Sequence, residues 1–299
     1  MNYDFIKEIC EKYGAEYAEN QPLAQYTSFK IGGSCPILVK PDSTPCLCEL
    51  VKAFNSYNTD YKIMGKGSNL LISDKGVDFP VVALSAMGEI RFEGERAFCG
   101  SGAALISVCR EAAENALGGL EFAYGIPGSL GGAVYMNAGA YGGEMKDIVE
   151  CVTYIDETGK IRRADRSQLD FSYRHSFFCD KKYIITDIAI KLSKGDKQSI
   201  NAKMQELMAR RKEKQPLEYP SAGSTFKRPE GDFAGRLIEE AGLKGFSVGG
   251  AQVSEKHCGF VINKGSADFC DVKAVIERVR EKVKEVSGRE LECEVIIWE

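Results

Sequence analysis

Apolar residues at three- and four-residue spacing predict six helices along this chain. In the first, an apolar face runs from Phe5 to Tyr13, and Gly14 then ends the helix. The last runs from Phe269 to Val286, and its apolar stripe favours a face packed on a core over a coiled-coil partner. The same spacing predicts four more helices, over residues 45–55, 103–117, 200–216 and 232–242.

Alternating apolar and polar positions predict strands between these helices. The clearest is Tyr183–Leu192, and a turn at Asp156–Gly159 joins two shorter strands into a hairpin. In a final strand, Glu292 and Glu294 share one face, and alternate apolar residues from 291 to 297 share the other. Other short strands are expected over 61–64, 81–84 and 96–99. Because helices and strands do not alternate as βαβ units, the pattern predicts an α+β fold with mixed sheets.

The composition is that of a globular protein, with 299 residues of which 44% are hydrophobic and 27% charged. This length suits roughly two domains, and the polar stretch Ser193–Lys197 is the expected boundary between them. The net charge of −4 offers no general attraction to nucleic acid or to an anionic membrane. We therefore expect neither among the partners, and we expect a monomer.

Eleven cysteines are spread through the chain without the spacing of a metal site. Cys46 and Cys48 have no second pair, and the only histidines are His175 and His257. The first residues lack the basic and apolar regions of a signal peptide, and no run approaches the roughly 20 apolar residues that span a membrane. These features predict a cytoplasmic protein with reduced thiols and no metal.

The segment Gly125–Gly143 holds seven glycines in nineteen positions. Ordering a glycine costs more conformational entropy than ordering any other residue, so this density needs a physical reason. One reading is a flexible linker, but Ile126, Leu130 and Val134 lie between the glycines and favour burial. The other is backbone packed closely against a ligand, with amide N–H groups of Gly128–Gly132 facing a phosphate. The composition favours this second reading, and hence a phosphate or dinucleotide site.

A second glycine turn, GKGSN at residues 65–69, follows the strand expected at 61–64. It lacks both the G-K-[ST] sequence of a P-loop and the full G-x-G-x-x-G pattern of a Rossmann turn. A lone G-x-G is weak evidence, since many tight turns have this composition. Two glycine-rich turns without either fingerprint nevertheless favour a dinucleotide site that is not of the Rossmann kind.

The two glycine segments, GKGSNLL and GIPGSLGGAVYMNAGAYG, resemble the paired flavin-binding loops of the vanillyl-alcohol-oxidase-type FAD fold. The second is similar in detail to the MurB family of UDP-N-acetylenolpyruvoylglucosamine reductases. Five further segments follow the order of that family: YTSFKIGG, SYRHSFF, SAGSTFKRP, GLKGFSVGGAQVSEKHCGFVIN and LECEV. Together these segments extend from Tyr26 almost to the C-terminus, and their combination is specific although each fragment alone is modest.

The resemblance implies a PCMH-like FAD-binding fold of two lobes, followed by an α+β domain that closes over a UDP-sugar. On this chain the FAD-binding domain is expected over residues 1–193, split near 80, and the substrate domain over 194–299. The last strand, at about 289–299, is expected to return to the FAD-binding lobes. FAD would be held without a covalent bond, by Gly65, Lys66, Gly67, Ser68, Asn69, Gly125, Pro127, Gly128, Ser129, Gly131, Gly132 and Asn137.

The reaction of that family reduces an enolpyruvyl ether and places two demands on the site. Hydride transfer to the alkene builds negative charge on the substrate carboxylate, which needs cations or strong donors nearby. The adjacent carbon then needs a proton from one side only. By resemblance, Arg174 and Glu294 stabilise the charge, Ser224 donates the proton, and NADPH is the reductant.

Each of these three residues also has an ordinary structural interpretation. A serine within A-G-S-T is typical of a turn or a cap, and Arg174 alone suggests a surface ion pair. Glu294 alone suggests the polar face of an edge strand. The family resemblance, rather than the local chemistry, favours the catalytic interpretation.

The diphosphate of a UDP-sugar needs local positive charge in an acidic chain. Lys214, in K-Q-P, resembles by position a family lysine that contacts the substrate. Lys227 and Arg228 follow the serine and are further candidates, although a solvated surface is their ordinary role. No long insertion separates Arg174 from the strand at 183, so the chain resembles the shorter members, which lack a tyrosine-bearing lid loop.

Two other functions fit parts of this pattern. One is an FAD-dependent oxidase or dehydrogenase of the same fold; covalent versions often attach flavin through histidine, and neither histidine lies in a glycine segment. The other is a non-catalytic flavin- or nucleotide-binding module, which has no need for Arg174, Ser224 and Glu294 together. The preferred prediction is an FAD- and NADPH-dependent reductase of an enolpyruvyl UDP-sugar in peptidoglycan precursor synthesis.

Overall fold

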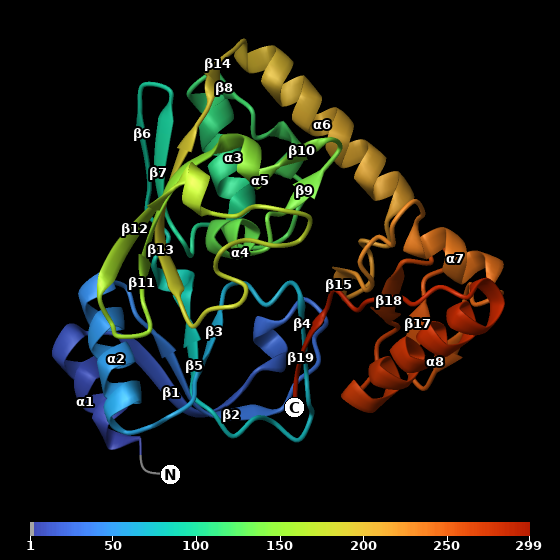
Figure 1. The fold of residues 1–299 in the computed structure, drawn as a ribbon, viewed down its shortest axis with the longest axis horizontal. Coiled ribbons are helices and arrows are strands. Elements are labelled where there is room, and N and C mark those ends of the chain that lie inside the picture. The colour runs from blue at the N-terminus through green and yellow to red at the C-terminus, as the bar shows by residue number, and fades with distance from the viewer. Residues whose placement is uncertain (1–2) are drawn as a thin grey trace. The chain divides into compact units, whose positions relative to one another are not determined.

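The computed structural model describes residues 3–299, and contacts within the chain divide it into two units (Figure 1). Unit 1 comprises Met1–Glu19, Ile37–Lys66 and Phe79–Arg210. Unit 2 comprises Asn20–Pro36, Gly67–Asp78 and Arg211–Glu299. These contact units do not coincide with a division near residue 193, so the assignment of functional domains remains a prediction.

A five-stranded antiparallel sheet organises the larger part of unit 1, in the order β12-β11-β13-β7-β6 (Figure 1). Two helices, α3 (Leu105–Glu114) and α4 (Leu130–Tyr135), pack on this sheet, and their apolar residues share one buried cluster with those of β11 and β13. The strands are β6 (Ile90–Glu93), β7 (Arg96–Gly100), β11 (Val149–Ile155), β12 (Ile161–Asp165) and β13 (Ile184–Lys191).

The other part of unit 1 is built around two parallel strand pairs. β5 (Val81–Ala83) lies between β2 (Ser34–Lys40) and β3 (Lys62–Met64) and runs parallel to both. The edge of this sheet is β1 (Glu16–Pro22). Its core includes the apolar faces of two helices, α1 (Asp4–Tyr13) and α2 (Thr44–Ser56).

In unit 2, a four-stranded antiparallel sheet packs with two helices. The strand order is β15-β18-β17-β16, and the helices α7 (Ala234–Glu240) and α8 (Phe269–Ser287) contribute their apolar faces to the same core. The strands are β15 (Ser221–Ser224), β16 (Ser247–Val248), β17 (Ala251–Val253) and β18 (Phe260–Asn263).

The C-terminal strand of unit 2 pairs with a segment from the first third of the chain. β19 (Ile296–Trp298) runs parallel to β4 (Leu70–Ile72), with Ile296 opposite Leu70. The Trp298 carbonyl accepts a hydrogen bond from the Ser73 N–H at 2.8 Å, which extends this pairing by one residue. The end of the chain is therefore joined to the strand that follows the first glycine turn.

One long helix and several short elements complete the described fold. The 18-residue helix α6 (Lys197–Lys214) contains the division between the units. Among residues 3–299, no helix is both long enough and apolar enough to cross a membrane, and no cluster of His, Cys, Asp or Glu suits a metal ion. The other elements are α5 (Met145–Ile148), β8 (Leu117–Gly118), β9 (Gly139–Ala140), β10 (Gly143–Glu144), β14 (Ser193–Lys194) and the 3-10 turns at 24–26, 84–86, 121–123 and 166–168.

The structure confirms most of the helices and strands that periodicity predicts. Gly14 ends α1 in the left-handed conformation, with φ 71°, as expected of a glycine after an apolar face. Two of the predicted elements are longer than the observed ones. The helix expected to reach residue 117 ends at Glu114, and the final strand is only Ile296–Trp298. Residues 291–295 alternate like a strand, yet only Cys293 forms an isolated bridge, with Phe226.

The hairpin between β11 and β12 is closed by the Asp156 carboxylate. Its Oδ1 accepts hydrogen bonds from the Thr158 hydroxyl at 2.6 Å and from the N–H groups of Thr158 and Lys160, both at 3.0 Å. Its Oδ2 accepts from Arg162 Nε at 2.8 Å. These donors, with the Thr158 hydroxyl first, hold the pKa of Asp156 well below its usual range.

We expect Asp156→Asn to lower the free energy of unfolding at pH 7 by about 1–3 kcal/mol, because the variant loses charge-assisted hydrogen bonds. The folded-state pKa is depressed, so the carboxylate stabilises the fold above its unfolded pKa of about 3.9, and this contribution is lost as pH falls through the folded value. Urea unfolding at several pH values should therefore show a weaker loss of stability in acid for the variant. Glu95→Gln, in the exposed turn before β7, is the control; an unchanged acid dependence of Asp156→Asn would contradict the assignment.

Candidate active site

The glycine-rich segment Gly125–Gly143 is ordered and packed, as expected of backbone that binds a ligand rather than of a flexible linker. Ser129 is the N-cap of α4, and its hydroxyl accepts a hydrogen bond from the Gly132 N–H at 3.3 Å. Leu130 and Val134 are fully buried on the helix. A flexible linker is therefore excluded, because the apolar residues between the glycines anchor the segment in the core of unit 1.

The two glycine segments meet within unit 1 at Gly65 and Ser129. A Cβ atom on Gly65 would lie 2.5 Å from Ser129 Oγ, so no larger residue fits at Gly65 without displacing that hydroxyl. Ser129 is 2% exposed. The close approach gives a steric reason for glycine at position 65 that composition alone did not provide.

The expected row of amide donors is shorter than predicted. The N–H of Leu130 donates to the Ala103 carbonyl, and that of Gly131 donates to the Ser101 carbonyl, each at 2.8 Å. With the Gly132 N–H donating to Ser129 Oγ, three of the five amides from Gly128 to Gly132 are bonded within the protein, which leaves those of Gly128 and Ser129 to meet a phosphate. Nearby, the Ser101 hydroxyl is buried without a hydrogen-bond partner among residues 3–299.

Gly131 and Gly132 are neighbours in α4 with opposite steric surroundings. A Cβ on Gly131 would lie 2.7 Å from Ser101 Cβ and 2.9 Å from the Ser101 carbonyl oxygen, whereas one on Gly132 would meet only Ser129 Oγ, at 3.4 Å. We expect Gly131→Ala to lower the free energy of unfolding by about 1–3 kcal/mol through overpacking. Gly132→Ala, the matched control, should be neutral or stabilise by up to about 1 kcal/mol because alanine favours helix. Equal unfolding midpoints in urea for both variants would contradict this explanation.

The candidate arginine lies at the tip of a tight turn in unit 1. Ser172 and His175 form an isolated antiparallel bridge, with N–H to carbonyl distances of 3.2 and 3.3 Å, and Tyr173 and Arg174 lie between them. Arg174 has φ 55°, in the left-handed region that side chains other than glycine rarely adopt. Its guanidinium carbon lies 5.1 Å from the centre of the Tyr173 ring. This turn presents Arg174 half-buried, rather than extended into solvent.

In unit 2 the structure brings the Ser224 and Glu294 segments together. The Glu294 N–H donates to the Thr225 carbonyl at 2.8 Å, so the candidate proton donor and the candidate carboxylate lie on adjoining backbone segments. Ser224 follows a bulge, because the pairing with β18 advances three residues on β15 and two on its partner. Gly223, with φ 76°, supplies the backbone conformation of this bulge.

The first glycine turn continues into unit 2, where it supports Glu294. Gly67 has φ 58°, and a Cβ there would collide with the Tyr26 carbonyl oxygen. Asn69 Nδ2 donates to the Glu294 carbonyl at 2.9 Å, and the Asn69 carbonyl accepts from the Ile296 N–H at 3.0 Å. Asn69 therefore fixes the backbone of Glu294, a role that its place in a predicted FAD turn did not reveal.

The candidate basic residues differ in their surroundings. Lys227 Nζ pairs with Glu292 Oε1 at 2.6 Å, which offsets its charge. The Arg228 guanidinium carbon lies 4.7 Å from the centre of the exposed Phe233 ring. Lys214 is exposed at the last residue of α6. Neutralisation by Glu292 weakens Lys227 as an anion site.

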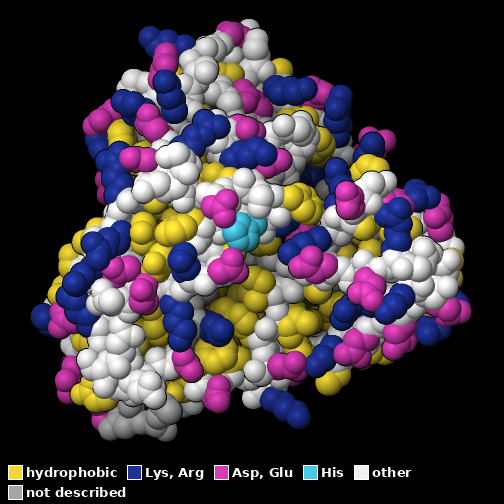
Figure 2. All heavy atoms as spheres, viewed as in Figure 1, with side chains coloured by type: hydrophobic (Ala, Val, Ile, Leu, Met, Phe, Trp, Pro, Cys, Tyr) yellow, Lys and Arg dark blue, Asp and Glu magenta, His cyan; other side chains and the backbone are white. Residues whose placement is uncertain are grey.

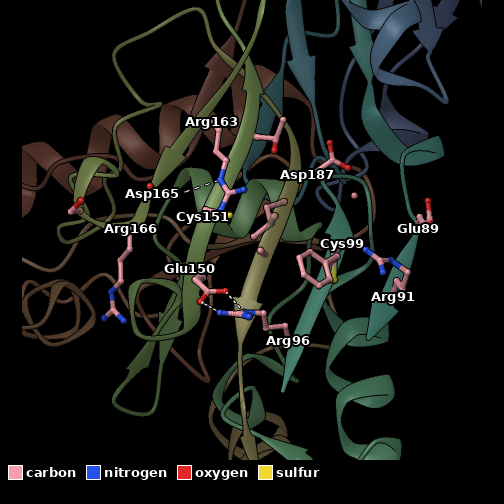
Figure 3. A pocket seen from close by; sticks show the side chains of 16 residues that line it. Glu89, Arg91, Arg96, Cys99, Glu150, Cys151, Arg163, Asp165, Arg166 and Asp187 are labelled. Atoms are coloured by element: carbon pink, nitrogen blue, oxygen red, sulfur yellow. Dashed lines mark hydrogen bonds and ion pairs between the residues drawn. The ribbon is translucent and has the colours of Figure 1, made fainter. Parts of the chain in front are cut away.

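A hollow of unit 1 lies elsewhere, on the open face of the five-stranded sheet (Figure 3). Its volume is about 1200 Å³, and none of the predicted site residues lines it. Arg96 makes a bidentate ion pair with Glu150 there, at 2.7 Å for both bonds, which holds the pKa of Glu150 below its usual range. On the face shown in Figure 2, basic and acidic side chains are likewise interspersed. This mixed charge gives the hollow no preference for an anionic or a cationic ligand.

Comparisons with known proteins identify the family. The model of the UDP-N-acetylenolpyruvoylglucosamine reductase C-terminal domain matches residues 215–298, and that of an FAD binding domain matches residues 36–165. A UDP-N-acetylenolpyruvoylglucosamine reductase of Caldanaerobacter subterraneus is 49% identical over 294 residues, which is 98% of this chain and 97% of that protein. One from Clostridium perfringens is 46% identical over 98% of this chain and 97% of its own length. The chain belongs to the MurB family.

Solved structures agree with this membership. The MurB crystal structure from Thermus caldophilus is 35% identical, with a TM-score of 0.81, and the match covers 95% of this chain and 99% of that one. A berberine bridge enzyme variant, described as a reticuline dehydrogenase, matches 64% of this chain and 44% of its own at 14% identity and a TM-score of 0.51. That second likeness shows the fold alone. The PCMH-like α+β fold expected from sequence is confirmed.

Membership of the MurB family makes the chain a flavoprotein oxidoreductase with FAD as its cofactor. The match to the FAD binding domain includes both glycine segments. Two observations fit such a group in unit 1: a Cβ on Gly65 would displace the Ser129 hydroxyl, and the Ser101 hydroxyl near Gly131 is buried without a partner among the residues described. All eleven cysteines are free, and burial raises the pKa of Cys109 to about 12, which keeps it protonated.

Proposed function

We propose that this chain catalyses the NADPH-dependent reduction of UDP-N-acetylglucosamine enolpyruvate to UDP-N-acetylmuramate, a step of peptidoglycan precursor synthesis. The observation that carries the proposal is the hydrogen bond from the Glu294 N–H to the Thr225 carbonyl, which joins the two segments that bear Ser224 and Glu294. These segments are far apart in sequence, and the adjacency of their backbones supports a site that uses both the carboxylate and the hydroxyl. A binding module would have no need for that pair.

FAD would be held by the residues of the two glycine segments. In unit 1 these are Gly65, Lys66 and the turn from Gly125 to Gly132, whose free amide donors suit a phosphate oxygen. Gly67, Ser68 and Asn69 continue the first turn in unit 2. When bound, FAD supplies the hydride that reduces the alkene carbon of the substrate, and NADPH is the proposed source of that hydride.

The protein's own residues then manage charge and protons. Reduction of the alkene places negative charge on the substrate carboxylate, and the planar guanidinium of Arg174 matches that group with two parallel donors. We assign Glu294 to the same polarising role. Ser224 donates a proton to the adjacent carbon; because a serine hydroxyl is a weak acid, the donor site must be connected to a further proton source.

The UDP-sugar diphosphate would be recognised by local positive charge. Lys214 is the preferred contact and Arg228 a further one, and Lys227 contributes if substrate displaces its pairing with Glu292. We further propose a monomer that acts in the cytoplasm and is of the shorter type without a tyrosine-bearing lid. The short loop between Arg174 and β13 supports the last point.

The test uses the purified protein under anaerobic conditions. We expect a yellow protein whose flavin absorbance is bleached by NADPH and restored by the enolpyruvyl UDP-sugar, with one equivalent of UDP-N-acetylmuramate formed. Reoxidation by oxygen at the rate given by the substrate would favour an oxidase instead. A reduced flavin that the enolpyruvyl UDP-sugar does not reoxidise would reject the proposed reaction.

A further inference from the structure

We propose that Asn137 is a positioning residue for Arg174, which it fixes through the carbonyl of Ser172. The inference rests on the proposed role of Arg174 and goes beyond it. The sequence placed Asn137 among the FAD contacts because it lies in the glycine-rich segment. Its side chain instead joins that segment to the turn that carries the arginine.

The amide of Asn137 makes three hydrogen bonds within unit 1. Its Nδ2 donates to the Ser172 carbonyl at 2.9 Å and to Glu144 Oε2 at 2.8 Å. Its Oδ1 accepts from the Lys146 N–H at 2.9 Å. Asn137 is 1% exposed, so each of these bonds is made away from water, where a lost partner is costly to leave unsatisfied. Both N–H donors of the side chain are therefore bonded within the protein.

The bond to Ser172 bears directly on the position of Arg174. Ser172 is also bonded in both directions to His175, which leaves only Tyr173 and Arg174 in the turn between them. A shift of the Ser172 carbonyl therefore displaces the backbone that carries Arg174, because only one residue separates the two. Arg174 itself has φ 55°, an unfavourable conformation that persists only where surrounding contacts enforce it.

A second bond ties the other side of the turn to the end of α4. The Ser176 hydroxyl donates to the Tyr135 carbonyl at 2.6 Å, and Ser176 is fully buried. Tyr135 and Asn137 both lie in the glycine-rich segment Gly125–Gly143. The turn that presents Arg174 is therefore anchored on the segment that is expected to meet FAD. The two bonds contact different parts of the turn. Ser176 lies after Arg174 and outside the Ser172–His175 bridge, whereas the Asn137 side chain bonds to Ser172, which is a member of the bridge.

The two test variants are chosen for the backbone of Asn137, which has φ 44°. Asn137→Gly keeps this conformation freely and removes the amide, and Asn137→Asp keeps the shape but replaces the donor with an acceptor. Each is combined with Arg174→Ala in a double-mutant cycle. Reoxidation of the NADPH-reduced protein by the enolpyruvyl UDP-sugar is measured, together with FAD affinity and hydrogen exchange of the 172–175 amides without substrate. Ser176→Ala is the matched control.

We expect either Asn137 variant to slow reoxidation by about tenfold or more when Arg174 is present and by less than about twofold when it is absent. Hydrogen exchange at 172–175 should accelerate, and FAD affinity should stay within about threefold of wild type. Ser176→Ala should give a smaller loss. A purely structural role would slow both backgrounds equally, and that result overturns the inference, as does a loss of FAD in both Asn137 variants. An Arg174→Ala protein as fast as wild type would overturn the role of Arg174 first and this inference with it.

Discussion

Ser224→Ala should slow reoxidation of the NADPH-reduced protein by the enolpyruvyl UDP-sugar by about 100- to 10,000-fold, the usual range for loss of a positioned general acid. Reduction of the flavin by NADPH should still occur, because the proposed proton is needed only after the alkene has received hydride. The two half-reactions are separated by anaerobic stopped-flow absorbance, so the step that fails is observed directly.

The structure supplies a matched control for this experiment in the same strand. Ser221→Ala alters a hydroxyl at the start of β15, three residues from Ser224, while its carbonyl still accepts a hydrogen bond from Ser28 Oγ at 2.6 Å. We expect Ser221→Ala to reoxidise within about threefold of wild type, as surface substitutions away from a site usually do. Normal reoxidation by Ser224→Ala would eliminate Ser224 as the donor and leave the proton to water or to another side chain.

Arg174→Ala should lower the rate of substrate reduction by about 100- to 1,000-fold, a typical cost for removing one group that stabilises developing negative charge. Arg174→Lys should recover only part of this loss, because lysine keeps the charge but lacks the planar pair of donors that matches a carboxylate. Reoxidation of the reduced protein is again the measurement.

The control for Arg174 lies on the open face of the sheet in the same unit. Arg163 pairs there with Asp165 at 3.5 Å (Figure 3), in a hollow that none of the predicted site residues lines. Arg163→Ala should therefore leave reoxidation near the wild-type rate. If Arg174→Ala were equally fast, the charge of the intermediate would have to be stabilised by other groups, and the proposed role of Arg174 would be rejected.

Much of the secondary structure was predictable because it depends on local patterns. An apolar face with a following glycine predicted α1, and the Asp156–Gly159 turn between alternating segments predicted the β11–β12 hairpin. The final strand was predicted too long for the same reason. Residues 291–295 have the alternation of a strand, but their pairing is limited to one bridge, between Cys293 and Phe226, and sequence periodicity contains no information about the extent of pairing.

For the site, the identity of the candidates was easier to predict than their surroundings. The glycine segments indicated a dinucleotide site, and resemblance indicated Arg174, Ser224 and Glu294. Sequence placed Asn137 with FAD and gave Asn69 no structural role beyond its glycine turn. In the structure Asn137 holds the Ser172 carbonyl, and Asn69 holds the Glu294 carbonyl. Neither bond has a local signal, since each joins a side chain to a backbone group far along the chain.

The sequence by itself determined the family, the cofactor and the position of the glycine-rich segments, because each of these depends only on residue types and their order. Only the tertiary structure determined that a Cβ on Gly65 would displace the Ser129 hydroxyl, and that some amides of Gly128–Gly132 donate to other groups of the protein. It alone also determined that the backbone of Glu294 lies beside the segment that carries Ser224. These features depend on close approach between distant segments. A hydrogen bond of 2.8 Å or a steric limit at one Cβ is a property of two backbones in space, and no periodicity along one of them can specify it.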